Sequence, residues 1–193
     1  MTHPHWTIDR GSTLLVIARG AIAEQLGLVG ASVPTAGWLE EPGASFVTLK
    51  RHGSLRGCIG TLAPGRPLGE DVAENARQAA FHDARFPPLA QSEFADTELE
   101  VSLLSPLEPV PCESEAHLLA RLRPGEDGLV LEWRDQRGAF LPQVWEQLPD
   151  PGDFLAHLKR KAGLSMDFWN DGIRFARFTV TRFHEEAGVE SRG

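Results

Sequence analysis

The chain has 193 residues, of which 41% are hydrophobic and 24% charged, and its formal net charge is −8. This is the composition of an ordinary globular protein with one core, or with two small subdomains that share one. The acidic balance and the lack of a basic stripe argue against nucleic-acid binding, which draws most of its affinity from neutralised phosphates. No apolar run approaches the roughly 20 residues that a membrane helix needs, so we expect no membrane partner.

The first residues lack the basic region and apolar stretch of a secretory signal, so we expect a cytoplasmic protein. Its two cysteines, Cys58 and Cys112, are then expected to be free thiols. The sequence has no Cys-x-x-Cys, no Cys/His cluster with zinc spacing and no glycine-rich phosphate loop. We therefore expect neither a metal nor a nucleotide cofactor.

Hydrophobic periodicity and turn signals divide the chain into a series of short elements. In chain order, the predicted elements are a helix over 8–26, strands over 46–50 and 55–61, a helix over 67–81, a strand over 98–105, a helix from Ser114 to Leu122, a hairpin of 128–134 and 138–142, a helix from Asp153 to Ala162 and a strand near 174–183. Strands and helices do not alternate regularly, as they would in a doubly wound protein. The pattern predicts an α+β fold, in which an antiparallel β-sheet packs with helices as an α/β sandwich.

The run 55–61 places a cation, a thiol and two glycines in one predicted strand. Side chains alternate between the two faces of a strand. If the preceding turn has an even number of residues, Val47 opposes Cys58, and Arg56 and Cys58 share the face of Val47. Lys50 then lies on the other face, whereas a turn of odd length would move Lys50 onto the Cys58 face. The sequence leaves both registers open.

Three residues are candidates for catalysis: Cys58, Arg56 and Asp83. A thiol reacts as its thiolate, and Arg56 would lower the pKa of the Cys58 thiol or hold a carboxylate or phosphate. Alternatively, Cys58 fills a small space, as free cysteines often do, and Arg56 forms an internal salt bridge with Glu100 or Asp83. Asp83 either anchors its own loop or approaches the Cys58 face as a polar partner.

Further candidates for ligand contact are Gly57, Gly60, Lys50, Arg85, Glu100 and Lys161. The two glycines would admit a ligand to the backbone, or would instead serve close packing or a bulge. Arg85 either contacts a ligand or pairs with Asp83. A carboxylate such as Glu100 would be notable in a cleft, because burying it without partners is costly. Lysines such as Lys50, Lys159 and Lys161 are more often surface charges.

Several ordered blocks of sequence resemble the signature of the AMMECR-type domain family, whose members are also called AmmeMemoRadiSam system protein A. The blocks are Leu55-Arg56-Gly57-Cys58-Ile59-Gly60-Thr61, then 84–89 preceded by Asp83, then 98–106, then 128–131 with 137–138 and 141–144, and finally 154–155 with 161–164. They follow the family order from about residue 10 to about residue 183, so the resemblance covers nearly the whole chain.

The resemblance implies a single AMMECR-type domain over residues 1–193. Its larger subdomain is expected from about 1–65 plus 146–193, and a smaller inserted α+β subdomain within about 66–145. The resemblance also implies an accessory component of an uncharacterised modification system, which acts with a Memo-like protein and a radical SAM protein. The redox or radical chemistry would belong to those partners. This chain would bind a small molecule or a partner protein in a groove between the subdomains, around Arg56, Cys58 and Asp83.

Two other functions stay open at this point. The chain would be a stand-alone cysteine-dependent enzyme if Cys58 is a nucleophile and Arg56 holds an anion or stabilises the thiolate. An accessible Cys58 with a depressed pKa would favour that hypothesis. A nucleic-acid-associated factor is the third hypothesis, and the charge of the chain disfavours it.

Overall fold

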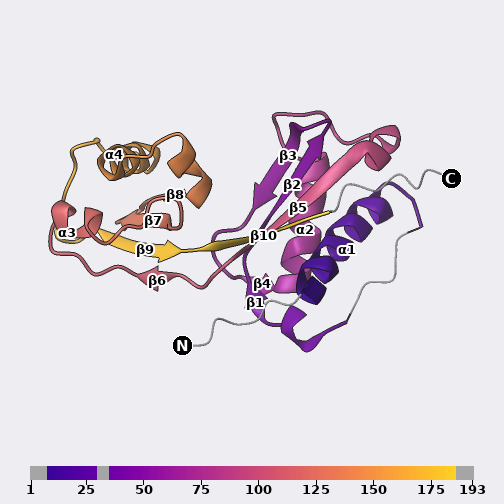
Figure 1. The fold of residues 1–193 in the computed structure, drawn as a ribbon, viewed down its shortest axis with the longest axis horizontal. Helices are drawn as coiled ribbons and strands as arrows, with labels where there is room; N and C mark the ends of the chain where they lie inside the picture. Colours follow the sequence, from indigo (N-terminus) through magenta and orange to yellow (C-terminus); the bar gives the residue numbers. More distant parts are fainter. Residues whose placement is uncertain (1–7, 30–34, 186–193) are drawn as a thin grey trace. The chain divides into compact units, whose positions relative to one another are not determined.

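The computed structural model describes residues 8–29 and 35–185 (Figure 1). In chain order, its elements are α1 (Ile8–Gln25), η1 (Gly37–Leu39), β1 (Pro42–Gly43), β2 (Ser45–Arg51), β3 (Ser54–Gly60), β4 (Arg66–Pro67), α2 (Leu68–Phe81), η2 (Gln91–Asp96), β5 (Thr97–Leu104), β6 (Glu108–Pro109), α3 (Glu115–Leu119), β7 (Gly128–Trp133), β8 (Gln136–Phe140), η3 (Pro142–Glu146), α4 (Pro151–Lys161), β9 (Arg174–Phe178) and β10 (Val180–His184). The paired strands are antiparallel, which confirms the predicted α+β fold. Within the described ranges, no helix has the length and apolar character needed to cross a bilayer.

The chain divides into two compact units, which we call unit 1 (1–103 and 181–193) and unit 2 (104–180). These boundaries differ from the predicted ones at about 65 and 146. Helix α2 and almost all of β5 belong to unit 1, because α2 packs in its core and β5 pairs with the whole length of β2. Helix α4 and strand β9 belong to unit 2, where β9 pairs with β7. Periodicity locates such elements, but it does not show which core each one joins.

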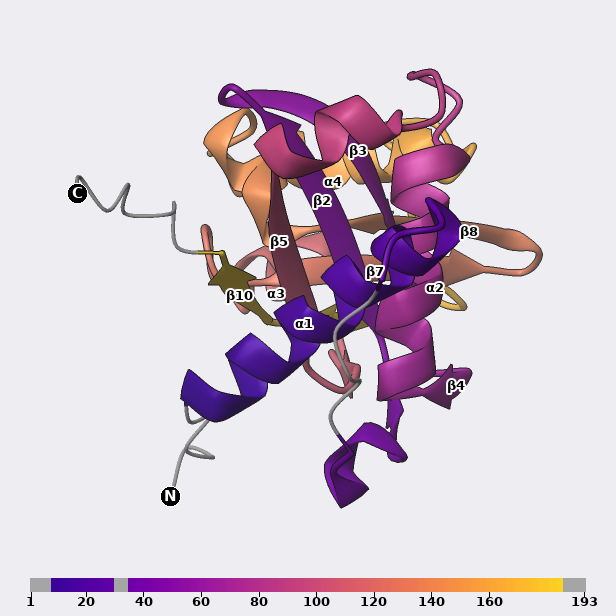
Figure 2. The same cartoon turned by 90° about the vertical axis from the view of Figure 1, so that its right-hand side faces the viewer.

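Unit 1 is built on a four-stranded sheet in the order β10-β5-β2-β3. Helices α1 and α2 lie against one face of this sheet (Figures 1 and 2). The buried core between them contains Val47, Leu49, Leu99 and Val101 from the sheet, Leu14, Ala18 and Ile22 from α1, and Val72, Ala76 and Ala79 from α2. Alternate residues of the same strands point away from the helices.

A β-bulge in β3 decides which residues share that second face. The observed cross-strand pairs are Arg51 with Ser54, Lys50 with Leu55, Leu49 with Gly57, and Thr48 with Cys58. The turn therefore has the even length considered above, but Arg56 is an extra residue that no residue of β2 opposes. The predicted pairing of Val47 with Cys58 is wrong for this reason. The extra residue moves Cys58 onto the face of Lys50, an outcome that the sequence had associated with an odd-length turn.

Unit 2 is built on a second four-stranded sheet, in the order β6-β9-β7-β8. Its core is largely aromatic and aliphatic, and the rings of Trp145 and Phe154 stack with centroids 3.7 Å apart. Helix α4 begins at Pro151, earlier than predicted, and Asp150 caps it, because its side chain accepts a hydrogen bond from the backbone N–H of Asp153. The single strand predicted near 174–183 is two strands, β9 and β10, which belong to different sheets.

Candidate functional site

The face of the unit 1 sheet that points away from α1 and α2 carries a row of polar side chains. We call it the polar face and define it by Thr48, Lys50, Cys58, Glu100 and His184. Thr48 opposes Cys58 on one neighbouring strand and Glu100 on the other, so these three residues lie in line across β3, β2 and β5. The structure thus brings together three of the predicted site residues, Lys50, Cys58 and Glu100.

Glu100 is the charged centre of the polar face. Its side chain is only 9% exposed, and the same carboxylate oxygen, Oε2, lies 3.2 Å from Lys50 Nζ and 3.2 Å from His184 Nδ1. Ser102 Oγ donates to the other oxygen, Oε1, at 3.5 Å. A buried carboxylate needs such partners, because an unpaired one costs several kcal/mol. The predicted salt bridge between Arg56 and Glu100 is wrong: Lys50 is the basic partner instead.

Cys58 is half-buried at the edge of the sheet, with its sulfur in a polar setting. Its Sγ atom is hydrogen-bonded to Thr48 Oγ1 at 3.2 Å. Its backbone N–H donates to Asp83 Oδ2 at 2.9 Å, and its backbone C=O accepts from Arg85 Nη2 at 3.3 Å. Both main-chain groups of Cys58 are therefore fixed by the side chains of one loop.

Asp83 and Arg85 form the ion pair that supplies these contacts. Arg85 donates to the Asp83 carboxylate from Nε at 2.9 Å and from Nη2 at 2.6 Å. The hydrogen bond from Arg85 holds the pKa of Asp83 well below its usual range, and the same hydrogen bond raises the pKa of Arg85. Because β3 is an edge strand, the pair takes the place of a neighbouring strand at Cys58. Asp83 anchors its own loop, and its contact with Cys58 is to the backbone N–H.

Arg56 has a different role from the one that the sequence suggested. Its guanidinium donates to both carboxylate oxygens of Glu93, at 3.2 and 2.9 Å, and to the backbone oxygens of Pro87 and Pro88. Arg56 lowers the pKa of Glu93 to about 2. The cation beside Cys58 is therefore Arg85, and Arg56 fastens the loop before β5. Glu93 was missed because no spacing rule links it to a bulge in a distant strand.

The two glycines of the run 55–61 are sites of close packing. A Cβ atom on Gly57 would lie 2.1 Å from the backbone oxygen of Ala79 in α2. A Cβ atom on Gly60 would lie 2.2 Å from the ring of Phe46 on the neighbouring strand. The geometry thus supports the packing interpretation of both glycines over ligand approach.

Asp71, which the sequence analysis did not single out as a site residue, ties the end of β3 to α2. Its buried carboxylate accepts hydrogen bonds from Ser45, Thr61 and Asn75, at distances of 2.7 to 3.0 Å. An acidic residue in the first turn of a helix is common on electrostatic grounds alone. The sequence therefore gave no sign that this one is internal.

Two lysines of α4 lie in unit 2. Lys161 is exposed and donates to the backbone oxygen of Ala139 at 2.9 Å, with its ammonium 5.1 Å from the centre of the Phe140 ring. Lys159 was expected at the surface, but its side chain is fully buried and donates to Glu115 Oε2 at 2.6 Å. The alternation of charged and apolar residues in α4 did not distinguish these two environments.

The polar face, together with the ion pair of Asp83 and Arg85 at its β3 edge, combines a thiol, a hydroxyl and three basic side chains with two internal carboxylates. Lys50 is 41% exposed, His184 59% and Arg85 56%, whereas Glu100 and Asp83 are almost wholly buried. The accessible side chains are thus basic, and the carboxylates are the less exposed groups. Such an arrangement favours an anionic group over a metal cation. Among residues 8–29 and 35–185, no group of three or more His, Cys, Asp or Glu side chains is placed to hold a metal ion.

Comparisons with known proteins agree over most of the chain. The sequence model of the AMMECR1 family matches residues 15–183. A protein of Methanothermobacter thermautotrophicus is 41% identical over 92% of this chain and 95% of its own length, and one of Methanocaldococcus jannaschii is 37% identical over 97% and 94%. The crystal structure of the uncharacterized protein PH0010 from Pyrococcus horikoshii is similar with a TM-score of 0.80 and 36% identity, over 92% of each chain.

Proposed function

Because the chain belongs to the AMMECR1 family, we propose that it is an accessory protein of a modification system and that it binds an anionic group of its ligand or partner on the polar face. One observation carries this proposal. The bulge at Arg56 turns Cys58 to the side of Thr48 and Lys50, and the loop pair holds Arg85 next to it. The thiol of Cys58, the hydroxyl of Thr48 and two cations are thus brought to one part of unit 1.

The fixed geometry around Cys58 supports recognition of a carboxylate or phosphate. Asp83 orients the Arg85 guanidinium through Nε and Nη2, which leaves Nη1 with no protein acceptor among the described residues. A guanidinium held in place loses little side-chain freedom when it binds an anion. Lys50, which lies on the same face as Cys58, adds a second cation.

In this proposal, a Memo-like protein and a radical SAM protein carry out the redox or radical chemistry. The test is to co-express each of them with the tagged chain and to measure the stoichiometry of what co-purifies. We expect a complex with at least one of them. We expect Lys50→Glu to lower the amount of that protein that co-purifies at least tenfold. Arg137→Glu, an exposed charge reversal in unit 2, is the matched control. Failure of both proteins to bind the unmodified chain would overturn the accessory role.

The anion-binding part of the proposal has its own test, which uses the thiol as a reporter. In a Cys112→Ser background, Cys58 is alkylated with iodoacetate, which is anionic, and with iodoacetamide, which is neutral. We expect Arg85→Gln to lower the ratio of the iodoacetate rate to the iodoacetamide rate several-fold, and Lys50→Gln to lower it less. Arg77→Gln, a charge removal in α2 between helices α1 and α2, should leave the ratio unchanged. An unchanged ratio in both test variants would mean that the polar face does not recognise anions.

A second candidate function is a cysteine-dependent enzyme with Cys58 as the nucleophile. The observation that favours it is the pairing of the sulfur with Thr48 and its proximity to Arg85, which replaces Arg56 as the cation beside the thiol. No described histidine lies within hydrogen-bond distance of Cys58 Sγ, so the activating group would be Arg85. An apparent pKa of alkylation well below the roughly 8.5 of a free thiol would support this enzyme. Slow alkylation until denaturant is added would exclude it.

A further inference from the structure

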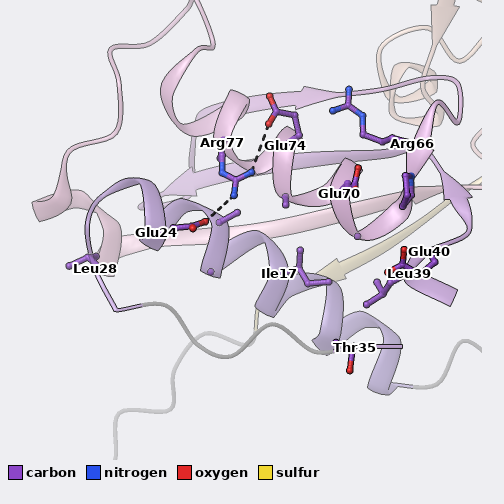
Figure 3. A pocket seen from close by; sticks show the side chains of 15 residues that line it. Ile17, Glu24, Leu28, Thr35, Leu39, Glu40, Arg66, Glu70, Glu74 and Arg77 are labelled. Carbon is purple, nitrogen blue, oxygen red and sulfur yellow. Dashed lines mark hydrogen bonds and ion pairs between the residues drawn. The ribbon is translucent and has the colours of Figure 1, made fainter. Parts of the chain in front are cut away.

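A groove lies between helices α1 and α2 of unit 1 (Figure 3), and none of the residues that define the polar face lines it. Its volume is about 730 Å³. Pockets that hold small organic ligands in proteins span roughly 300 to 1,000 Å³. The groove is thus large enough for a ligand of that size.

The floor of the groove is apolar and buried. It is formed by Ile17 and Ala21 of α1 and by Leu39 of η1, each at most 5% exposed. Gly69 has no side chain and Ala73 only a methyl group, so these positions of α2 leave space in the groove. Such a floor would cover the methylene chain of a ligand and remove it from water, which favours binding of an aliphatic chain.

The rim of the groove is acidic. Four glutamates and two arginines line it: Glu24, Glu40, Glu70 and Glu74, with Arg66 and Arg77. Both arginines already face carboxylates, since Arg77 lies between Glu24 and Glu74 and Arg66 lies 3.7 Å from Asp71. Glu40 and Glu70 form no ion pair with any described cation. Among the described residues, the groove therefore has two carboxylates without an ion-pair partner above an apolar floor.

We infer that this groove binds a linear alkylammonium ligand, with its methylene chain on the apolar floor and its ammonium groups at Glu70 and Glu40. Charge complementarity selects a cation, and the apolar floor selects an aliphatic chain over a hydrated metal ion. The ion pairs of Arg77 with Glu24 and Glu74 lie along the rim of the groove (Figure 3). The inference does not depend on Cys58 or on the proposed function of the polar face.

Isothermal titration calorimetry of the full chain with spermidine, and with α,ω-diamines of two to eight carbons, tests the inference. We expect saturable binding of one spermidine and affinity that rises with diamine length. Glu70→Gln and Glu40→Gln should each weaken binding about threefold, and the double variant about tenfold, since each removes one exposed ion pair. Ala73→Leu, which fills the groove without changing its charge, should abolish binding.

Glu146→Gln, which removes an exposed carboxylate of unit 2, is the matched control and should leave the affinity unchanged. Circular dichroism of each variant establishes that the fold is retained. Three results would overturn the inference: no binding of spermidine or of any diamine, equal binding of ethylenediamine and of the long diamines, or equal losses in Glu146→Gln and Glu70→Gln. The last two would indicate diffuse attraction to an acidic protein.

Discussion

Unit 1 and unit 2 each pack helices on one face of a four-stranded antiparallel sheet, but they stabilise that packing by different means. Unit 1 contains most of the buried polar or charged residues that the structure describes: Ser45, Arg56, Asp71, Asn75, Asp83, Thr97, Glu100 and Ser102. Unit 2 contains Asp127 and Lys159. Its core instead depends on packed rings, such as those of Trp145, Phe154 and Phe140.

This difference shows in which unit the positions of side chains are fixed more closely. Hydrogen bonds have narrow limits of distance and angle, whereas burial of apolar surface is non-directional. In unit 1 these directional contacts converge on strands β2 and β3 and on the loop that holds Cys58. Unit 1 is therefore the part of the molecule in which one conformation is specified most closely, as a binding site requires.

The largest effect is expected for Gly57→Ala, because its new Cβ would lie 2.1 Å from a backbone oxygen of α2. Either β3 or α2 must shift, and we expect a loss of about 3 kcal/mol or more in the free energy of unfolding. Gly60→Ala is the matched variant: its Cβ would meet the ring of Phe46, which can rotate, so the loss should be smaller. Urea denaturation gives both values.

Amide hydrogen exchange then shows whether the damage stays within one unit. We expect faster exchange in peptides of α2 and β3 of the Gly57→Ala variant and little change in β7 and α4. Wild-type stability of Gly57→Ala would show that α2 does not pack closely on β3. Equal acceleration in both units would show that the two cores unfold as one.

The sequence was sufficient for the elements and insufficient for their register. Hydrophobic periodicity located α1, α2 and the β2–β3 hairpin to within one or two residues, because each buries one face against a core. It could not predict the bulge at Arg56, which depends on contacts with the distant residue Glu93. A shift of one residue changes the face of every side chain beyond it. The pairing of Cys58 was therefore wrong although its strand was right.

The candidate site, too, could be predicted from the sequence only in part. The sequence drew attention to Cys58, Asp83 and Arg85, and the structure brings these three into contact. It assigned the thiol-flanking cation to Arg56 because that residue is the nearest in sequence, and Arg85 holds that place in space. Residues brought together by a loop and an edge strand leave no periodic signal. Their proximity depends on tertiary contacts alone.

The next largest effect is expected at Lys159 of unit 2. This residue is an exception to the contrast between the two units, because it is a buried charged residue in unit 2. Its ammonium is fully buried and pairs with Glu115, which is 39% exposed. Glu115→Gln leaves a buried charge without its counter-charge, and we expect a loss of about 2 kcal/mol in unfolding free energy, below the full penalty because water reaches Glu115. Lys159→Met keeps the apolar stem near Trp169 and should cost little or stabilise.

A double-mutant cycle with these two variants measures the coupling between the side chains, with unfolding followed by tryptophan fluorescence. If unit 2 depends on apolar packing, the combined variant should be about as stable as Lys159→Met alone. If Lys159→Met instead destabilises as strongly as Glu115→Gln, unit 2 also requires a polar contact. The contrast between the units would then fail.

The smallest expected effect is the pH dependence that Glu93 contributes to unit 1. Arg56 lowers the pKa of Glu93 from its ordinary value of 4.5 to about 2, so the folded state binds this proton less readily than the unfolded state. The stabilisation is fully present above about pH 4.5 and is lost as the pH falls towards about 2. Because both side chains are partly exposed, we expect the difference in unfolding free energy between wild type and Glu93→Gln to shrink by only about 1 kcal/mol between pH 6 and pH 2.5.

Asp83 has a lowered pKa as well, but it is present in both proteins, so its contribution cancels in this difference. Glu126→Gln, which removes an exposed partner of Arg123 in unit 2, is the control and should show a much smaller change with pH. A difference for Glu93→Gln that is the same at both pH values would mean that the pair of Arg56 and Glu93 does not stabilise the loop through its charge. In that case Arg56 would hold the loop through its hydrogen bonds to the backbone oxygens of Pro87 and Pro88. Directional hydrogen bonds, rather than ionised pairs, would then distinguish unit 1 from unit 2.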